Sequence, residues 1–99
     1  MHSVILGPSL NLARVAKCGR NAEYMSGEDP YLGAEMVKPW VETFQGDGLL
    51  VGVKHWALNN QETFRDCIDS TVDERVLWEM YYGPFAAAVE VNAASFMCE

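Results

Sequence analysis

Three cationic side chains and one imidazole lie where the chain is expected to leave its strands, and these residues are the best suited to chemistry. Lys54 and His55 end the apolar run 49–53, Arg20 lies in an earlier loop, and Arg65 follows Lys54 by eleven positions. Arginine offers a planar fork of N–H donors, lysine a compact charge, and histidine a donor or acceptor that depends on its tautomer. Together they suit a ligand with several oxygen acceptors. From residue type alone, the simpler interpretation is that each cation pairs with a surface carboxylate.

His55 has two other possible roles, as the partner of a cysteine nucleophile or as a metal ligand together with His2. The three cysteines, Cys18, Cys67 and Cys98, are widely and irregularly spaced. This spacing matches neither a zinc pattern nor a self-contained disulfide framework. No metal or cofactor is therefore predicted, and the thiols are expected to be buried or free.

Composition limits the remaining classes of function. The chain has 99 residues, a net charge of -7 and 49% hydrophobic residues, which fits at most one small folded domain. A nucleic-acid surface or attraction to anionic lipid would need a basic patch, so neither partner is predicted. No apolar run approaches the roughly 20 residues that span a bilayer, and residues 1–4 do not begin a signal peptide. Oligomeric state and compartment stay open.

Turn and capping signals divide the chain into alternating strands and helices. An apolar strand at 4–6 meets Gly7-Pro8 and leads into a long loop. Asp29-Pro30 marks a helix start, because aspartate caps free amides and proline fits the first helical position. The helix is predicted over 30–45, kinked at Pro39 and ended by residues 46–48. Its predicted apolar face contains Leu32, Met36, Trp40, Val41 and Phe44.

The second half repeats this alternation. The apolar run 49–53 is typical of a strand buried on both faces in a parallel sheet. Residues 71–74, Thr-Val-Asp-Glu, form a capping box that opens a second helix, which Gly83-Pro84 should distort. Its predicted apolar face contains Leu77, Met80, Tyr81, Phe85 and Val89, and a last strand is expected over 94–98. The order strand, helix, strand, helix, strand at this spacing favours a parallel sheet.

Several segments, in order along the chain, carry a resemblance to a known family. They are Gly19-Arg20-Asn21-Ala22-Glu23, Gly27-Glu28-Asp29-Pro30, Gly52-Val53-Lys54-His55-Trp56-Ala57-Leu58-Asn59-Asn60-Gln61-Glu62, the helical segment Val72–Tyr81, and Met97-Cys98. The chain resembles glycoside hydrolase family 3. It lacks the Pro-Gly-His-Gly loop that follows Lys-His in the family's N-acetylglucosaminidases, so it is similar to the β-glucosidase and β-xylosidase branch. Ala16, Ser26 and Pro39 depart from the family's pattern and put loop geometry and stability in question.

The resemblance implies an α/β fold, part of a (β/α)8 TIM-type barrel with about two βα units plus a terminal strand. A whole barrel needs roughly 250 residues, so residues 1–99 are expected to form an incomplete piece of the N-terminal catalytic barrel domain. Both ends of the chain fall in or beside strands, where domain boundaries are not expected. The open edges and apolar surface of such a piece predict marginal stability or aggregation when it is isolated.

The resemblance also assigns roles to residues. In the family, five matching positions hold the sugar in the first subsite. The predicted substrate-binding residues are therefore Arg20, Lys54, His55, Arg65 and Met97. The alternative for Met97, a core residue of a buried strand, is equally open. The family's nucleophilic aspartate comes from a later strand and its acid/base from a following domain, so no catalytic residue is predicted within this chain. The carboxylates are left without a catalytic role: Glu23, Glu28, Asp29, Glu62 and Asp69, of which Asp29 is expected to cap a helix and Glu62 to organise its own loop.

The implied activity is that of a retaining β-glucosidase-like enzyme, which hydrolyses O-glycosyl bonds and releases β-D-glucosyl residues from non-reducing ends. The predicted substrates are β-glucosides or β-xylosides, and no cofactor is implied. The isolated chain is expected to be inactive, because the reacting carboxylates lie elsewhere. The alternatives are a non-catalytic sugar-binding or interaction module and a non-functional truncated product.

Overall fold

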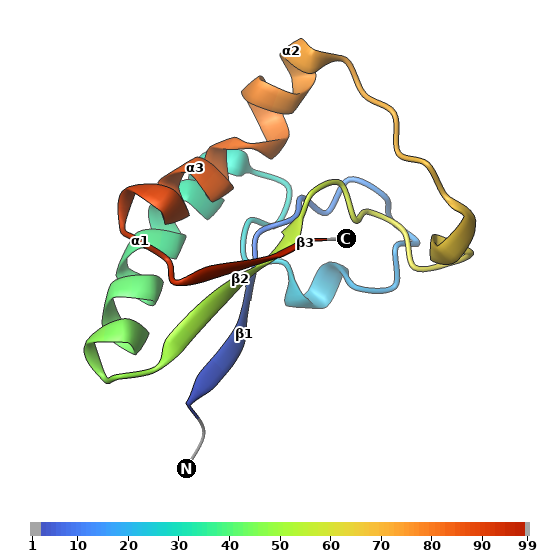
Figure 1. Cartoon of the computed structure of the whole chain (residues 1–99). Helices are drawn as coiled ribbons and strands as arrows, with labels where there is room; N and C mark the ends of the chain where they lie inside the picture. Colours follow the sequence, from blue (N-terminus) through green and yellow to red (C-terminus); the bar gives the residue numbers. More distant parts are fainter. Residues whose placement is uncertain (1–2, 99) are drawn as a thin grey trace.

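Three parallel strands form the sheet of the computed structural model, which describes residues 3–98 (Figure 1). They are β1 (Val4–Ser9), β2 (Leu50–Trp56) and β3 (Ser95–Cys98), in the order β1-β2-β3. Val4 pairs with Leu50 in the first ladder, and Lys54 pairs with Met97 in the second. The predicted parallel sheet and the predicted alternation of strands and helices are confirmed. Two of the strands are longer than expected, since β1 continues through Gly7-Pro8 and β2 through Trp56.

The first long helix, α1 (Pro30–Gly46), begins and ends close to the predicted bounds. The Asp29 side chain accepts a hydrogen bond from the Tyr31 amide at 2.9 Å, which confirms the predicted cap. Pro30 occupies the first turn, where no donor is needed. Pro39 lies inside the helix without ending it, and the kink expected there stays a prediction. No helix among residues 3–98 is long and apolar enough to cross a membrane.

The buried face of α1 differs from the predicted one. It consists of Gly33, Val37 and Val41, with Trp40 and Phe44 packed beside the core, whereas Leu32 and Met36 are exposed. The periodicity of large apolar residues does not predict this face, because α1 approaches Ser26 closely at Gly33, and glycine carries no hydrophobic signal.

The second helical region is divided into three parts. They are α2 (Glu74–Val76), a π-helical turn η3 (Leu77–Tyr81) and α3 (Gly83–Glu90), so the predicted distortion at Gly83-Pro84 is confirmed. The predicted capping box is wrong, because the residue before α2 is Asp73 and its side chain makes no capping hydrogen bond.

The predicted apolar face of this region is wrong at two of its five members, while Leu77 and Tyr81 are partly buried. Phe85 is buried, together with Pro84, Ala87 and Ala88, but Met80 and Val89 are exposed. The π turn explains the error, since the Tyr82 amide bonds the Leu77 carbonyl (2.8 Å) five residues back. A π turn inserts one residue into the helical repeat. The residues on its two sides therefore do not share one continuous face.

The core lies between the sheet and two helices that cover one of its faces, α1 and α3 (Figure 1). Val51 and Val53 of β2 point into this core with Val37, Val41 and other buried residues. Because side chains alternate along a strand, Leu50, Gly52 and Lys54 belong to the opposite face of the sheet. That face carries the exposed side chains of Val4, Leu6 and Leu50.

We expect the 99-residue chain to self-associate, because this uncovered face is apolar and each of β1 and β3 has only one neighbouring strand within residues 3–98. An apolar groove of about 600 Å³ beside β3, lined by Trp56, Trp78, Phe85 and Phe96 among others, adds to the exposed surface. Sedimentation velocity should show a concentration-dependent increase in mass. Leu6→Lys, which places a charge on the uncovered face, should reduce it. A monomer that unfolds cooperatively at all concentrations would contradict this expectation.

Candidate functional site

The predicted site residues gather at the carboxyl ends of the strands. Lys54 and His55 lie near the end of β2, and Met97 lies beside Lys54 in β3. Arg20 comes from the loop between β1 and α1, next to the short helix η1 (Asn21–Glu23), and Arg65 begins the short helix η2 (Arg65–Cys67). The Lys54–His55 peptide bond is cis.

Hydrogen bonds between two loops set the position of Arg20. The hydroxyl of Tyr24 donates to the carbonyl of Asn59 (2.8 Å), and the Asn60 side chain donates to the carbonyl of Leu12 (2.7 Å). The Glu62 amide donates to the carbonyl of Cys18 (3.0 Å). These bonds join the segment after β1 to the segment after β2. They bring Arg20 and Glu62, far apart in the sequence, into direct contact.

Arg20 is the centre of the cluster. Its Nη2 lies 3.1 Å from Nε2 of His55, and its Nη1 donates to Glu62 at 3.0 Å. Its Nε also donates to Glu23. Only 21% of the side chain is exposed, so these contacts hold the guanidinium in one place. Partial burial opposes a rise in the pKa of Arg20, but the two carboxylates outweigh it and raise the pKa above its ordinary value.

Glu23 links Arg20 to Lys54. The Lys54 ammonium lies 3.1 Å from Glu23, and only 17% of the lysine side chain is exposed. Partial burial acts to raise the pKa of Glu23, but the hydrogen bonds and charges of Lys54 and Arg20 prevail and lower it. Glu23 is therefore ionised at neutral pH and holds both cations.

The lowered pKa of Glu23 predicts a dependence of stability on pH. A carboxyl whose pKa is lower in the folded state stabilises the fold above its unfolded pKa, here an ordinary value of 4.5, and this contribution is lost as the pH falls through the lower folded value. The difference in unfolding free energy between the wild type and Glu23→Gln should shrink as the pH falls below 4.5. Glu79→Gln, which removes an exposed pair with Arg75, should show a much smaller difference throughout. If the loss of unfolding free energy varied with pH in the same way in both variants, Glu23 would not have the lowered pKa described above.

Glu62 links Arg20 to Arg65 in the way that Glu23 links Arg20 to Lys54, so cations and carboxylates alternate through the cluster. One oxygen of Glu62 contacts both Arg20 (3.0 Å) and Arg65 (3.3 Å). Arg65 is the most exposed of the four predicted cationic or imidazole groups, with 53% of its side chain accessible. The simple interpretation that the cations pair with carboxylates thus holds for Arg20, Lys54 and Arg65. The same pairs also assemble the cluster, because Glu23 and Glu62 lie between the cations.

His55 is the most deeply buried member of the cluster, with 2% of its surface exposed. Its backbone and ring contact Asn11, a residue that no motif in the sequence identifies. Asn11 is itself 3% exposed. Its only signal in the sequence is a polar side chain between Leu10 and Leu12. Glu62 is expected from the sequence to organise its own loop, and the cations to pair with surface carboxylates, but no pattern identifies Glu23 and Glu62 as the partners of these cations.

Met97 lies on the same face of the sheet as its partner Lys54. Phe96, its neighbour in β3, faces the helices and places its ring 6.4 Å from that of Phe85. By alternation, Met97 points to the uncovered face, and it is partly rather than fully buried. This position separates Met97 from the core beneath the helices.

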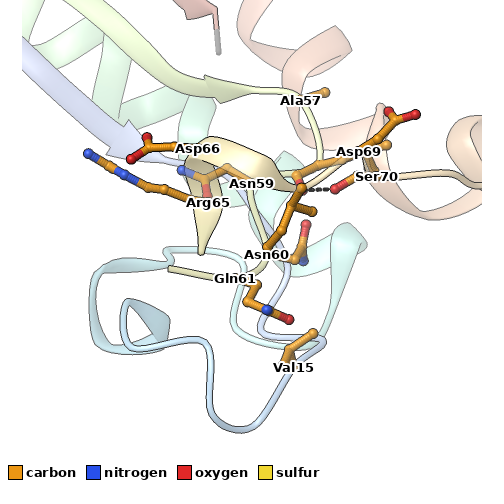
Figure 2. Close-up of a pocket in the computed structure, with 11 residues that line it drawn as sticks. Val15, Ala57, Asn59, Asn60, Gln61, Arg65, Asp66, Asp69 and Ser70 are labelled. Atoms are coloured by element: carbon orange, nitrogen blue, oxygen red, sulfur yellow. Dashed lines mark hydrogen bonds between the residues drawn. The ribbon is translucent and has the colours of Figure 1, made fainter. Parts of the chain in front are cut away.

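A cavity of about 570 Å³, lined by both polar and apolar side chains, adjoins the cluster at Arg65 (Figure 2). The loop after β2 supplies most of its lining, including Asn59, Asn60 and Asp69. Ser70 lies across this loop and donates to the Leu58 carbonyl at 3.4 Å. Arg65 therefore belongs both to the charged cluster and to the lining of this cavity.

The thiols and possible metal ligands are spread over the fold. Cys18, Cys67 and Cys98 are free, and the buried Cys18 lies 3.1 Å from the hydroxyl of Tyr24. Burial, with a contribution from Cys18, raises the pKa of Tyr24. Among residues 3–98, no group of three or more histidine, cysteine, aspartate or glutamate side chains is placed to hold a metal. His2, considered above as a metal ligand, lies outside the described residues.

Parallel strands, helices on one face of the sheet and polar groups at the carboxyl ends of the strands are the arrangement expected for part of a β/α barrel. Known proteins identify the family, although no family model matches the chain. β-Glucosidase BoGH3A of Bacteroides ovatus is 49% identical over 91 residues, which cover 92% of this chain. Thermostable β-glucosidase B of Acetivibrio thermocellus is 46% identical over 88 residues, or 89% of this chain.

Solved structures of β-glucosidases are similar to this chain as well. DesR, a β-glucosidase from Streptomyces venezuelae in complex with D-glucose, matches 97% of this chain with a TM-score of 0.93 and 41% identity. β-Glucosidase 3B from Thermotoga neapolitana in complex with glucose matches 97% with a TM-score of 0.91 and 42% identity. The chain belongs to glycoside hydrolase family 3, and the predicted partial barrel is confirmed. It spans only 12% of the length of the two sequence relatives and 12–13% of these two solved chains.

Proposed function

We propose that this chain is a segment of a retaining β-glucosidase-like hydrolase, which cleaves O-glycosyl bonds and releases β-D-glucosyl residues from non-reducing ends. The main support is the 49% identity to a β-glucosidase over nearly the whole chain. Further support comes from two similar solved β-glucosidases that contain D-glucose or glucose. β-Glucosides are the proposed substrates, and β-xylosides are the second choice within the same branch.

In this proposal, Arg20, Lys54, His55, Arg65 and Met97 line the glycone subsite. The alternating charges suit a sugar, because each hydroxyl both donates and accepts a hydrogen bond. Arg20 and Lys54 donate hydrogen bonds to hydroxyl oxygens, while Glu23 accepts hydrogen bonds from hydroxyl groups. The carboxylates also fix the cations before the sugar arrives, which reduces the entropy lost on binding. Hydrogen bonds of this kind can strengthen as the sugar ring approaches its oxocarbenium-like transition state.

The chemical step is assigned to residues outside this chain. A retaining mechanism needs a carboxylate nucleophile and a carboxylic acid about 5 to 5.5 Å apart on opposite sides of the glycosidic bond. Glu23 and Glu62 are each engaged with two cations, which suits a supporting role. The 99-residue chain is accordingly proposed to be inactive by itself.

Segment exchange tests the function. The matching segment of Thermotoga neapolitana β-glucosidase 3B is replaced by this chain, and hydrolysis of 4-nitrophenyl β-D-glucoside and β-D-xyloside is measured. The hybrid should hydrolyse the glucoside, while the 99-residue chain alone should not. The same exchange with the segment of the Kluyveromyces marxianus β-glucosidase, another structural relative, is the control for the joins. An active control beside a folded, inactive hybrid would refute the proposal and favour a binding module or a non-functional product.

A further inference from the structure

The side chain of Asn11 pairs with the backbone of a residue 44 positions away. Its Nδ2 donates to the carbonyl of His55 (3.0 Å), and its Oδ1 accepts from the His55 amide (2.8 Å). The side-chain amide therefore serves both main-chain polar groups of His55, as a neighbouring strand would. Asn11 and His55 are both buried, so these bonds are shielded from water.

This double pairing fixes the orientation of the Asn11 amide. If the amide were rotated by half a turn, its NH2 group would face the His55 N–H and its oxygen would face the His55 carbonyl. Both contacts would be repulsive and buried, which is costly. The Asn11 atom beside the imidazole is therefore the oxygen, and it lies 3.3 Å from Nδ1. The Ser9 hydroxyl donates to the same oxygen at 3.3 Å.

The fixed oxygen determines the state of the nearer ring nitrogen. A carbonyl oxygen only accepts hydrogen bonds, so Nδ1 of His55 must carry a proton to bond it. The other ring nitrogen, Nε2, lies 3.1 Å from Nη2 of Arg20. A guanidinium has only donors, and this contact favours a lone pair on Nε2. Two neighbours on opposite sides of the ring thus favour the same neutral tautomer.

We propose that Asn11 is a positioning residue that holds the His55 proton on Nδ1 and turns Nε2 toward Arg20 and the candidate site. The inference rests on the proposed function for its consequence: the Nε2 edge of the ring presents only a lone pair, which Arg20 occupies before the sugar arrives, so Nε2 donates to no sugar hydroxyl. Asn11 does not touch the sugar. It acts by fixing both the orientation and the tautomer of a residue that does.

The test uses the full chain labelled with 15N in its histidine rings. Long-range proton–nitrogen correlations at neutral pH report which ring nitrogen carries the proton, and His2→Gln identifies the second histidine of the chain. Magic-angle-spinning spectra serve if the protein associates. We expect Nδ1 of His55 to be protonated and Nε2 to be unprotonated. A neutral ring with its proton on Nε2 overturns the proposal.

Variants separate positioning from general structural effects. Asn11→Leu removes the amide at similar size, and the Nδ1–H form should lose its dominance. Asn11→Asp keeps an acceptor beside Nδ1 and should keep the proton there, but it should also destabilise the fold, because an oxygen replaces the NH2 group that donates to the His55 carbonyl. Ser9→Ala, which removes only the hydroxyl contact, should leave the tautomer unchanged. If neither Asn11→Leu nor Asn11→Asp folds, the tautomer of the wild-type protein still decides the matter. If Asn11→Asp folds, loss of its Nδ1–H form contradicts the proposal. An unchanged tautomer in folded Asn11→Leu also overturns it.

Two independent measurements, the tautomer and the rate of hydrolysis, keep this inference separate from the proposed function. The tautomer is measured without sugar and does not depend on hydrolysis. In the hybrid enzyme, Asn11→Leu should lower kcat/KM for 4-nitrophenyl β-D-glucoside by about tenfold, and Asn11→Asp should recover part of the loss. An inactive wild-type hybrid with the expected tautomer counts against the function alone. An active hybrid with the opposite tautomer counts against the role of Asn11 alone.

Discussion

Replacing Gly33 with alanine should destabilise the chain by roughly 3 kcal/mol, the largest effect on stability that we expect from a single added methyl group. An alanine Cβ would lie 2.1 Å from Oγ of Ser26 and 2.7 Å from its Cβ. Ser26 is fully buried and donates to the carbonyl of Leu10 (2.9 Å), so it cannot move without losing that bond. Alanine's better helix propensity, about 1 kcal/mol, does not offset this clash. Urea unfolding followed by tryptophan fluorescence measures the difference.

Two further variants isolate the cause of this loss. Gly46→Ala changes a glycine of the same helix that has no atom within 4 Å of its added Cβ, and it should be neutral within about 1 kcal/mol. Ser26→Gly should relieve the clash and recover part of the stability when combined with Gly33→Ala. If Gly33→Ala is as stable as the wild type, Gly33 does not pack against Ser26 as closely as described above.

Replacing Lys54 with methionine should reduce kcat/KM of the hybrid enzyme about 100-fold or more, which corresponds to roughly 2.7 kcal/mol of lost transition-state stabilisation. The change removes the charge and keeps most of the length of the side chain. It also leaves Glu23 with one cation fewer, in a site where only 17% of the lysine side chain was exposed. Initial rates with 4-nitrophenyl β-D-glucoside, together with circular dichroism, separate lost activity from lost folding.

Lys38→Met is the matched control for this loss. Lys38 also pairs with a carboxylate, at 2.9 Å from Glu90, but the pair joins α1 to α3 on the exposed side of the helices. Its removal should change kcat/KM less than twofold, because exposed pairs contribute little. Equal effects of the two substitutions would mean that Lys54 has no special place in the subsite.

The sequence by itself determined the features that depend on neighbouring residues. Asp29-Pro30 began α1 as expected, because a cap and a proline act within the first turn. The apolar run before Lys54 predicted a buried strand, and the order of elements predicted a parallel sheet. The apolar run and the order of elements were enough to place Lys54 and His55 at one end of the sheet.

Only the tertiary structure decided which side chains meet. Arg20 contacts His55 across 35 positions and Glu62 across 42, and Asn11 contacts His55 across 44. The face that α1 buries was also decided in this way, since Gly33 is buried by its approach to Ser26. Such contacts depend on strand register and on the paths of two loops, which no local pattern specifies. Helix and strand preferences act over a few residues, whereas a binding site is a property of distant segments packed together.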